Sequence, residues 1–385
     1  MKRIAATLLT LSLLLIGCNA EPPAQPDPLA GWLETANLAA EETPEQLYAA
    51  AKTEGMLTVY STSTRMMDVA ESFEKEYPGL TVKVNHTREP ELYELLAANY
   101  AAGDFTVDLI TISDGRGVMT NEFLPKNIVA KYVPYDIADK LLPGNNDELL
   151  ALAGESPILQ YNDAYYSEPP VHNWWELTED KWRGLVHMPN PSKSATTLAF
   201  LMTVMANSDL MAEGYETLYG EPLAVPEGET AGRIFIRRLV ENGVVIVNSS
   251  DEAVEIVGSP GSSTPNLAVA ISSKTRLREI GYRHENNYDM EPFCGVYIPI
   301  NVMITGGAPN INTAKLFIRW MFGGTDGQGE GYKPYLLSGQ WSVRSDVRDI
   351  TDVRPEELNL LQLNKNYQYE NQEAFLAFWA ELMAA

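Results

Sequence analysis

Four short clusters of hydroxyl and cationic side chains stand out in the sequence, because each directly follows a stretch with the character of a β-strand. The clusters are residues 61–64, 113–116, 192–197 and 272–276. Serine and threonine hydroxyls can donate to an oxyanion, and guanidinium or ammonium groups can balance its charge. Together, the four clusters point to the recognition of an anion.

The cluster at residues 192–197 is the most informative one. Ser192, Lys193 and Ser194 stand where an apolar helix is predicted to begin. The unpaired backbone N–H groups and the dipole of a first helical turn favour a bound anion. The same hydroxyls would also serve as ordinary helix caps, and the other three clusters could equally be turns or solvated helix starts.

Motifs of common enzyme classes are missing from the sequence. It has no Gly-x-Ser-x-Gly, Walker loop, dinucleotide glycine fingerprint or His-Glu-x-x-His. The four histidines are scattered, and no spacing among the 52 acidic residues singles out a catalytic pair. We therefore expect no catalysis, no resident metal and no cofactor. Tyr165 and Tyr166 could supply phenolates to Fe(III), although simple aromatic packing is the more ordinary explanation.

The composition excludes several classes of partner. The chain has 385 residues, of which 28 are basic and 52 acidic, for a net charge of −24. Because no stretch is both basic and aromatic, we expect neither nucleic-acid binding nor attachment through a polybasic surface. Cys18 and Cys294 are the only cysteines, which excludes a disulfide scaffold and a cysteine-based metal site. The length suits two or three domains.

The N-terminus has the features of an export signal. Lys2 and Arg3 precede an apolar stretch, residues 5–16, that is too short to span a membrane. Residues 15–18 resemble a bacterial lipobox, so Cys18 is a predicted lipidation site; an ordinary signal followed by a chance cysteine is the alternative. Residues 18–42 are rich in Pro, Ala and acidic side chains, which predicts a disordered tether.

From residue 43 the pattern alternates between strands and helices. Strands are predicted at 56–60, 80–84 and 107–112, with an amphipathic helix near 66–77 after the first of them. This alternation predicts an α/β fold with a parallel sheet covered on both faces. Such sheets bind ligands beyond the carboxyl ends of their strands, which is where the four clusters lie. A second unit begins near residue 157.

Several ordered segments carry a resemblance to a known family. They are residues 57–61 (Leu-Thr-Val-Tyr-Ser), 73–79 (Phe-Glu-Lys-Glu-Tyr-Pro-Gly), 107–110, 175–186, 188–191 (Met-Pro-Asn-Pro) and 307–317. Together with the export signal and the lipobox, they resemble the extracellular solute-binding lipoproteins of ABC importers. The group most similar to this chain contains ferric-ion-binding, thiamine-binding and sugar-phosphate-binding proteins.

The resemblance implies the two-lobe α/β fold of type II periplasmic binding proteins, with a ligand cleft between the lobes. The expected divisions are a signal peptide at 1–17, a tether at 18–42, lobe 1 at 43–155 and 295–345, and lobe 2 at 156–294 and 346–385. The lobes would close about crossing strands near Pro157 and Val296.

The resemblance also bears on the ligand. Ser194, Ala195 and Thr196 match the helix N-terminus at which ferric-ion-binding members hold a synergistic anion. Those members place two tyrosines after the strand that is here 267–271, whereas this chain has Ser272, Ser273 and Lys274, so a tyrosine-held iron is disfavoured. The predicted ligand-binding residues are Ser61, Ser63 and Arg116 of lobe 1 and Ser194, Thr196, Thr197, Ser273 and Lys274 of lobe 2.

We therefore expect an exported, lipid-anchored monomer, facing the periplasm or the cell exterior, that captures a small organic phosphate or carboxylate and delivers it to a membrane permease. Two alternatives stay open. One is binding of Fe(III) with a synergistic anion, and the other is an exported lipoprotein hydrolase. A buried carboxylate pair facing the cleft would favour the hydrolase, and a cationic, hydroxyl-lined cleft would favour capture.

Overall fold

The structure is a computed structural model that describes residues 29, 31–351 and 353–384. The predicted signal peptide and the predicted lipidation site, Cys18, lie outside the described residues. Across the described part of the chain, no helix combines the length and the apolar character needed to cross a membrane.

Lobe 1 is built on parallel strands, as the alternating sequence pattern predicts. Strands β1 (Leu57–Ser61), β2 (Val82–His86) and β3 (Leu109–Ile112) pair in parallel in the order β2-β1-β3. Helix α3 (Met66–Glu76) connects β1 to β2 and buries apolar residues along one face, and α4 (Glu89–Ala102) connects β2 to β3. The carboxyl ends of β1 and β3 are therefore neighbours at one edge of the sheet.

Lobe 2 has a mixed sheet. Strands β6 (Pro157–Asn162), β9 (Leu267–Ile271), β7 (Val186–Pro189) and β8 (Val245–Val247) follow one another across it. Strand β6 is antiparallel to β9, whereas β7 is parallel to both of its neighbours. Helix α5 (Ala195–Ala206) follows β7, and its sequence is apolar on all sides because the helix is buried along most of its length.

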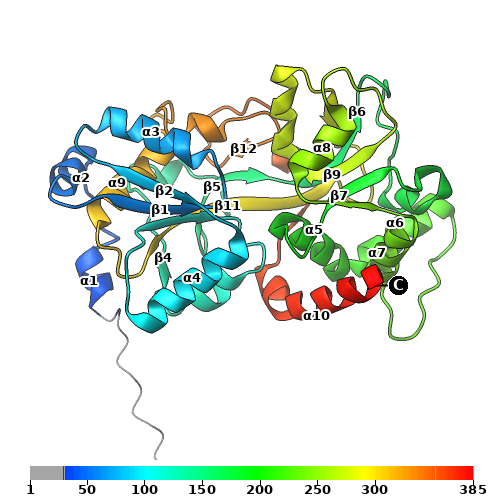
Figure 1. Cartoon of the computed structure of the whole chain (residues 1–385), viewed down its shortest axis with the longest axis horizontal. Helices are drawn as coiled ribbons and strands as arrows, with labels where there is room; N and C mark the ends of the chain where they lie inside the picture. Colours follow the sequence, from blue (N-terminus) through cyan, green and yellow to red (C-terminus); the bar gives the residue numbers. More distant parts are fainter. Residues whose placement is uncertain (1–28, 30, 352, 385) are drawn as a thin grey trace, which may run out of the picture.

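One long strand, β11 (Gly295–Thr305), belongs to both lobes (Figure 1). Its first residue pairs with β6, and its C-terminal half pairs antiparallel with β3, so the sheet continues from one lobe into the other. Strand β5 (Leu150–Glu155) runs antiparallel beside the middle of β11 and leads through Ser156 into β6. The chain therefore crosses between the lobes at the junction of β5 and β6, at β11, and again between the strands at Trp341–Ser342 and Leu360–Gln362.

The remaining elements cover these sheets. The other helices are α1 (Trp32–Ala36), α2 (Pro44–Ala51), α6 (Ser208–Tyr219), α7 (Ala231–Glu241), α8 (Ser250–Gly258), α9 (Ile311–Met321) and α10 (Lys365–Ala384). The other strands are β4 (Val129–Ala130), β10 (His284–Asn286), β12 (Trp341–Ser342) and β13 (Leu360–Gln362). Short 3-10 or π-helical turns occur at Met119–Phe123, Ala138–Lys140, Trp174–Thr178, Asp180–Trp182, Ser272–Ile280, Lys333–Tyr335 and Pro355–Glu357.

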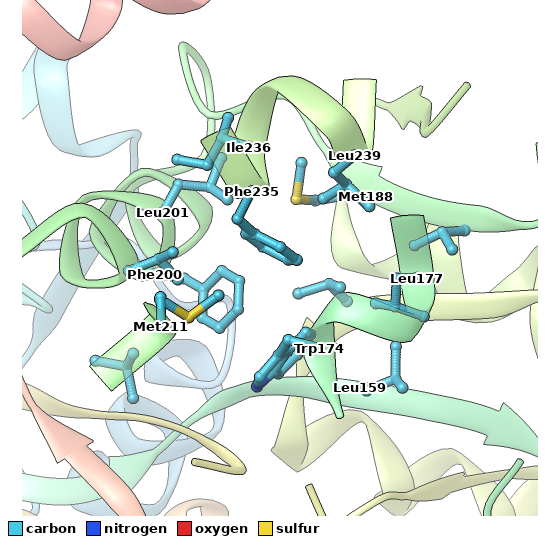
Figure 2. Close-up of a cluster of buried hydrophobic side chains, with 14 of the residues drawn as sticks. Leu159, Trp174, Leu177, Met188, Phe200, Leu201, Met211, Phe235, Ile236 and Leu239 are labelled. Carbon is cyan, nitrogen blue, oxygen red and sulfur yellow. The ribbon is translucent and has the colours of Figure 1, made fainter. Parts of the chain in front are cut away.

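Each lobe has its own apolar core. In lobe 2 the side chains of Trp174, Phe200 and Phe235 fill the space between the sheet and its helices (Figure 2). In β11, Ile298 belongs to this core, whereas Ile300 belongs to the core of lobe 1. The same strand therefore contributes buried apolar surface to both lobes, which fastens them to each other at the crossing.

The tether predicted over 18–42 is wrong for residues 31–42, which are packed against lobe 1. Helix α1 forms there, with Ala36 buried. The Nζ of Lys315, on α9, donates to the Glu42 carboxylate at 2.6 Å, and the Lys315 side chain is only 2% exposed. The prediction failed because the partner of this segment lies far along the chain, on a helix near the C-terminal end of lobe 1.

Candidate ligand-binding cleft

The four polar clusters lie on both sides of the junction between the lobes. Two of them follow β1 and β3 of lobe 1, and two follow β7 and β9 of lobe 2. The lobes are in contact here, since a Cβ added to Gly115 would lie 2.9 Å from the carbonyl oxygen of Ala195, the first residue of α5. The clusters that were identified by residue type therefore come from both lobes, and two of them meet where Gly115 lies against Ala195.

The two predicted serines of lobe 1 form hydrogen bonds within that lobe. Ser61 is fully buried, and its hydroxyl accepts a hydrogen bond from the Thr111 hydroxyl at 2.7 Å. The same oxygen donates to the Ser63 carbonyl and accepts from the Ser63 N–H, each at 3.0 Å. The Ser63 hydroxyl in turn accepts from the N–H of Arg65 at 3.3 Å. These bonds shape the turn that presents Arg65 at the start of α3.

Arg116 lies on a loop that is held by a buried carboxylate. The N–H groups of Gly115 and Arg116 donate to the two oxygens of Glu89 at 3.4 and 3.2 Å. The Tyr93 hydroxyl donates to Glu89 at 2.7 Å and lies 3.1 Å from the Asp114 carboxylate. The Nε atom of Arg116 is buried without a hydrogen-bond partner among the described residues. The guanidinium of Arg116 therefore has unused donor capacity at the edge of the cleft.

Glu89 and Asp114 form a buried carboxylate pair, the feature that the hydrolase alternative requires. Burial, followed by repulsion from Asp114, raises the pKa of Glu89 to about 7. Both carboxyls are almost completely covered, however, with Glu89 4% exposed and Asp114 0% exposed. Asp114 accepts hydrogen bonds from the N–H groups of Met119 and Thr120 at 2.9 and 3.1 Å. The partners of both carboxyls are protein groups, so the pair positions the loop instead of facing the cleft.

Ser194, Thr196 and Thr197 come together at the start of α5. The Ser194 hydroxyl accepts from the N–H of Thr197 at 3.3 Å and lies 3.0 Å from the Thr197 hydroxyl and 3.2 Å from the Thr196 hydroxyl. Thr197 is buried, while Ser194 and Thr196 are half-buried. The arrangement is that of a helix cap, placed where α5 meets Gly115 of lobe 1.

Ser273 and Lys274 already have partners in this structure. Ser273 is fully buried and donates to Glu155 Oε2 at 2.8 Å. The Nζ of Lys274 donates to Asp251 Oδ1 at 2.5 Å, at the start of α8. Burial of Lys274 lowers its pKa, and the Asp251 carboxylate opposes that effect. The charge of Lys274 is therefore balanced within lobe 2.

An arginine cluster, which the sequence-based selection missed, joins the two lobes. It consists of Arg65, Glu155, Ser273, Arg276 and Gln340. Arg65 of lobe 1 donates to Gln340 Oε1 at 2.7 Å, and its Nη2 lies 3.6 Å from Glu155 Oε2, the oxygen that accepts from Ser273 of lobe 2. Arg276 donates to the Ser273 carbonyl at 2.8 Å. Because Glu155 ends β5, both lobes meet at a carboxylate of the crossing segment.

The arginine cluster carries a surplus of positive charge and of hydrogen-bond donors. Arg65 and Arg276 both interact electrostatically with the carboxylate of Glu155, and Arg276 interacts also with Asp251, which is paired with Lys274. Burial together with the nearby Arg65 lowers the pKa of Arg276. The Nε2 of Gln340 and the hydroxyl of Tyr335 are buried without partners among the described residues. The Tyr335 ring lies 5.7 Å from the Arg65 guanidinium. The cluster can therefore accommodate further acceptor atoms.

The signal for this cluster was only partly present in the sequence. Arg65 directly follows the hydroxyl run after β1, and Arg276 belongs to the run after β9, so both were adjacent to residues that were chosen. The sequence around Arg65 contains no sign of its partners Glu155 and Gln340, because Arg65 and Gln340 are separated by 275 positions. Only the folded chain shows that Arg65 meets Glu155, the carboxylate that also accepts a hydrogen bond from Ser273 of the other lobe.

The tyrosine pair considered for Fe(III), Tyr165 and Tyr166, packs ring against ring at the surface of lobe 2. The rings of Tyr165 and Tyr166 meet edge to face with centroids 4.7 Å apart, and the Tyr166 hydroxyl donates to the Pro265 carbonyl at 3.0 Å. Tyr165 is 51% exposed on the surface. Within residues 29, 31–351 and 353–384, no group of three or more His, Cys, Asp or Glu side chains is placed to hold a metal ion.

A cavity of about 690 Å³ also lies between the lobes, and it contains none of the predicted ligand-binding residues. Its walls come from the loop that precedes β5, from β11, from the end of α5 and from the segment between β13 and α10. Two separate interlobe features thus exist, the arginine cluster with its neighbouring loops and this cavity.

Comparison by sequence identifies no relative: no family model matches the chain, and neither does any curated protein. Comparison by structure identifies many similar proteins. Iron-bound HitA from Pseudomonas aeruginosa aligns with a TM-score of 0.63 and 17% identity, covering 85% of this chain and 99% of that one. The periplasmic binding protein AfuA from Actinobacillus pleuropneumoniae, with fructose-6-phosphate bound, aligns with a TM-score of 0.62 and 16% identity over 85% of this chain and 98% of its own.

A third similar structure binds a different kind of compound. MotA from A. tumefaciens, described in complex with glucopine, aligns with a TM-score of 0.59 and 11% identity over 85% of this chain and 99% of that one. All three comparisons span nearly the whole of the solved chains, so the similarity covers both lobes. The predicted fold is confirmed: the chain has the two-lobe α/β fold of type II periplasmic binding proteins.

Proposed function

We propose that this chain is the solute-binding component of an ABC importer, and that it captures a small organic phosphate or carboxylate between its lobes and delivers it to a membrane permease. The structural similarity to periplasmic binding proteins supports the transport role. One of those neighbours holds a phosphorylated sugar. No bond is made or broken in the proposed function, so no catalytic residue and no cofactor are assigned.

The observation that best supports an anionic ligand is the arginine cluster. Arg65 lies 3.6 Å from the Glu155 carboxylate, and Arg276 interacts electrostatically with Glu155 and with Asp251. Because Asp251 is paired with Lys274, these groups together carry a net positive charge where the lobes meet. The unpartnered Nε2 of Gln340 and hydroxyl of Tyr335 add two donors that need acceptors. A phosphate or carboxylate presents several acceptor oxygens and negative charge in one compact group, which matches this surplus.

An anion at this place would link the lobes. A ligand held by Arg65 and Arg276 contacts both sides of the crossing at Glu155, so its binding favours the arrangement in which the two sides are close. We keep the residues predicted from the sequence as further proposed ligand contacts. They are Ser61, Ser63, Arg116, Ser194, Thr196, Thr197, Ser273 and Lys274.

Iron is a less suitable ligand for this cleft. One structural neighbour is described as iron-bound, but two guanidinium groups at the junction would repel a trivalent cation. Burial also raises the pKa of the Tyr335 hydroxyl well above its ordinary value, which opposes the phenolate form that Fe(III) requires. We therefore propose the anion in place of the metal.

The remaining features of the proposal concern location and organisation. We propose export through the signal at 1–17, lipid anchoring at Cys18 and a monomeric state, with lobe 1 formed by 43–155 and 295–345 and lobe 2 by 156–294 and 346–385. The separate apolar cores on either side of β11 support this division. Because residues 31–42 pack on lobe 1, they are left out of the proposed tether.

Thermal unfolding with a ligand panel tests the proposal. The soluble form beginning at Asn19 is heated with hexose phosphates, phosphonates, dicarboxylates, thiamine or Fe(III)-citrate. A specific ligand at 100 times its Kd adds about 2.7 kcal/mol to stability, which raises the Tm by several degrees. We expect a rise with an organic phosphate or carboxylate.

Variants locate the binding. Arg276→Gln should abolish the rise in Tm, and Lys274→Gln tests the cation chosen from sequence. The matched control is Arg183→Gln, because Arg183 is an exposed arginine that pairs with Asp180 away from the junction. A rise that survives in Arg276→Gln would refute the anion site. A rise with Fe(III) alone would replace the anion by iron as the ligand.

A further inference from the structure

The cavity between the lobes lies behind the crossing strands, on the face opposite the arginine cluster. Strands β5 and β11 pair with Ile298 opposite Glu155 and Pro299 opposite Gly154. Side chains alternate between the faces of a strand, so Tyr297 and Pro299 lie on one face and Glu155 on the other. Tyr297 and Pro299 line the cavity, whereas Glu155 belongs to the arginine cluster. The two features are therefore separated by the thickness of the sheet.

Contacts within the structure agree with this placement. A Cβ added to Gly154 would lie 2.3 Å from the hydroxyl of Tyr297, so the tyrosine ring covers the glycine on the cavity side. The Tyr297 hydroxyl donates to Asn145 Oδ1 at 3.2 Å, across the floor of the cavity. Gly154 thus leaves the space that Tyr297 needs in order to lie flat along the crossing strands.

Both lobes contribute to the walls. Asn145 comes from lobe 1 and Asn301 from β11. Asn207 at the end of α5 and residues 362–366, from the end of β13 to the start of α10, come from lobe 2. A molecule in this cavity would touch both lobes and the strand that joins them. At about 690 Å³, the cavity falls within the range of sites for small organic ligands.

The lining is unusually rich in side-chain amides. Six of them surround the space, and they are Asn145, Asn207, Asn301, Gln362, Asn364 and Asn366. An amide offers both donor and acceptor atoms, and so does a hydroxyl group, whereas a phosphate or carboxylate offers acceptors only. The charged groups of the lining are Asp147, Glu148 and Lys365, so no surplus of positive charge is present.

Asn301 shows that part of this hydrogen-bonding capacity is unused. Its side chain is only 1% exposed, and its Nδ2 donates to the carbonyls of Ile112 and Ser113 at 3.3 and 3.2 Å. Its Oδ1 accepts no hydrogen bond from the described residues, although the side chain lines the cavity. This oxygen is therefore open to the cavity and free to accept a hydrogen bond, which a hydroxyl-bearing ligand would supply.

We propose that this hinge cavity is a second ligand site, and that it binds a neutral polyhydroxylated compound of the size of a disaccharide. Pro299 and the Tyr297 ring provide the apolar surface against which the C–H face of a sugar can pack, and the amides pair with its hydroxyls. The site is independent of the proposed anion capture, since the arginine cluster lies on the other face of the strands.

The test is titration of the whole chain with trehalose, maltose and myo-inositol, followed by calorimetry and by the Tm. Sugars also stabilise proteins by being excluded from the surface, and that effect rises steadily with concentration. The expected result is instead a saturable heat and a saturable rise in Tm with one of the three compounds. Steady, non-saturating increases with all three would overturn the proposal.

Three variants establish the location. Ala206→Trp places a large ring at the wall of the cavity and should abolish the saturable component, because Ala206 lines it at the exposed end of α5. Ala102→Trp is the matched control, since Ala102 is the exposed last residue of α4 and lies outside the cavity. Arg276→Gln should leave sugar binding unchanged. Sugar binding that is lost in Arg276→Gln but retained in Ala206→Trp would place it at the arginine cluster and refute the hinge site.

Discussion

Replacing Glu89 by Gln should change how the stability of this protein depends on pH. Glu89 is 4% exposed, and burial together with the neighbouring Asp114 raises its pKa from 4.5 to about 7. The folded protein therefore holds a proton on Glu89 between pH 4.5 and 7, whereas the unfolded chain does not. The contribution of Glu89 to stability is complete below pH 4.5 and is lost as the pH rises toward 7.

The magnitude follows from the two pKa values. Each pKa unit corresponds to about 1.36 kcal/mol, so the free energy of unfolding should fall by roughly 2.5 kcal/mol between pH 5 and pH 8 because of this single group. Gln has no proton to lose, and Glu89→Gln should remove that part of the dependence. The variant gains stability relative to the wild type as the pH rises, whatever constant offset the amide introduces.

Urea unfolding at pH 5, 6, 7 and 8 measures this effect as the difference between wild type and variant. The control is Glu91→Gln on the same helix, because hydrogen bonds from Arg88 and Thr87 lower the pKa of the exposed Glu91 and its pH dependence runs in the opposite direction. Parallel curves for wild type and Glu89→Gln from pH 5 to 8 would show that Glu89 is charged in the folded protein, and would refute the reasoning.

Three further predictions concern contacts described above. Gly115→Ala places a methyl group 2.9 Å from the Ala195 carbonyl, so the lobes should separate slightly and the radius of gyration in small-angle scattering should increase, with an unchanged radius contradicting the contact. Lys315→Met leaves Glu42 unpaired, and limited proteolysis should then cut within residues 31–42 faster than in the wild type. Trp174→Ala should lower the free energy of unfolding by about 3–5 kcal/mol in urea, because it empties part of a core (Figure 2); a loss below 1 kcal/mol would mean that the site collapses.

The sequence was sufficient for the fold and for placing the polar clusters after their strands. Alternating strands and helices determine where strands end, and Ser61 and Ser273 do follow β1 of one lobe and β9 of the other, whereas their contact with a ligand stays a prediction. What local sequence does not contain is the identity of hydrogen-bond partners. Lys274 is paired with Asp251 from another helix, and Ser61 with Thr111 from the neighbouring strand.

The same limitation explains the arginine cluster. Arg65 and Arg276 were as visible in the sequence as the cations that were selected, and their importance depends on Glu155 and Gln340, which fold toward them from distant segments. Likewise, the composition of residues 31–42 indicates a tether, yet Lys315 of α9 holds the segment against lobe 1. In each case a long-range contact decides what a residue does, and residue type alone is insufficient.

Strand β11 has a consequence for the order in which the chain can acquire structure. Lobe 1 lacks a central strand until β11 is present, and the contact between Asn301 and Ile112 spans 189 positions. The core of lobe 2 is likewise incomplete without β11 and without α10, the last helix of the described residues. During synthesis, which starts at the N-terminus, the chain therefore cannot complete lobe 1 before lobe 2. Both must remain incomplete until roughly the last hundred residues have been synthesised, which favours slow folding late in synthesis.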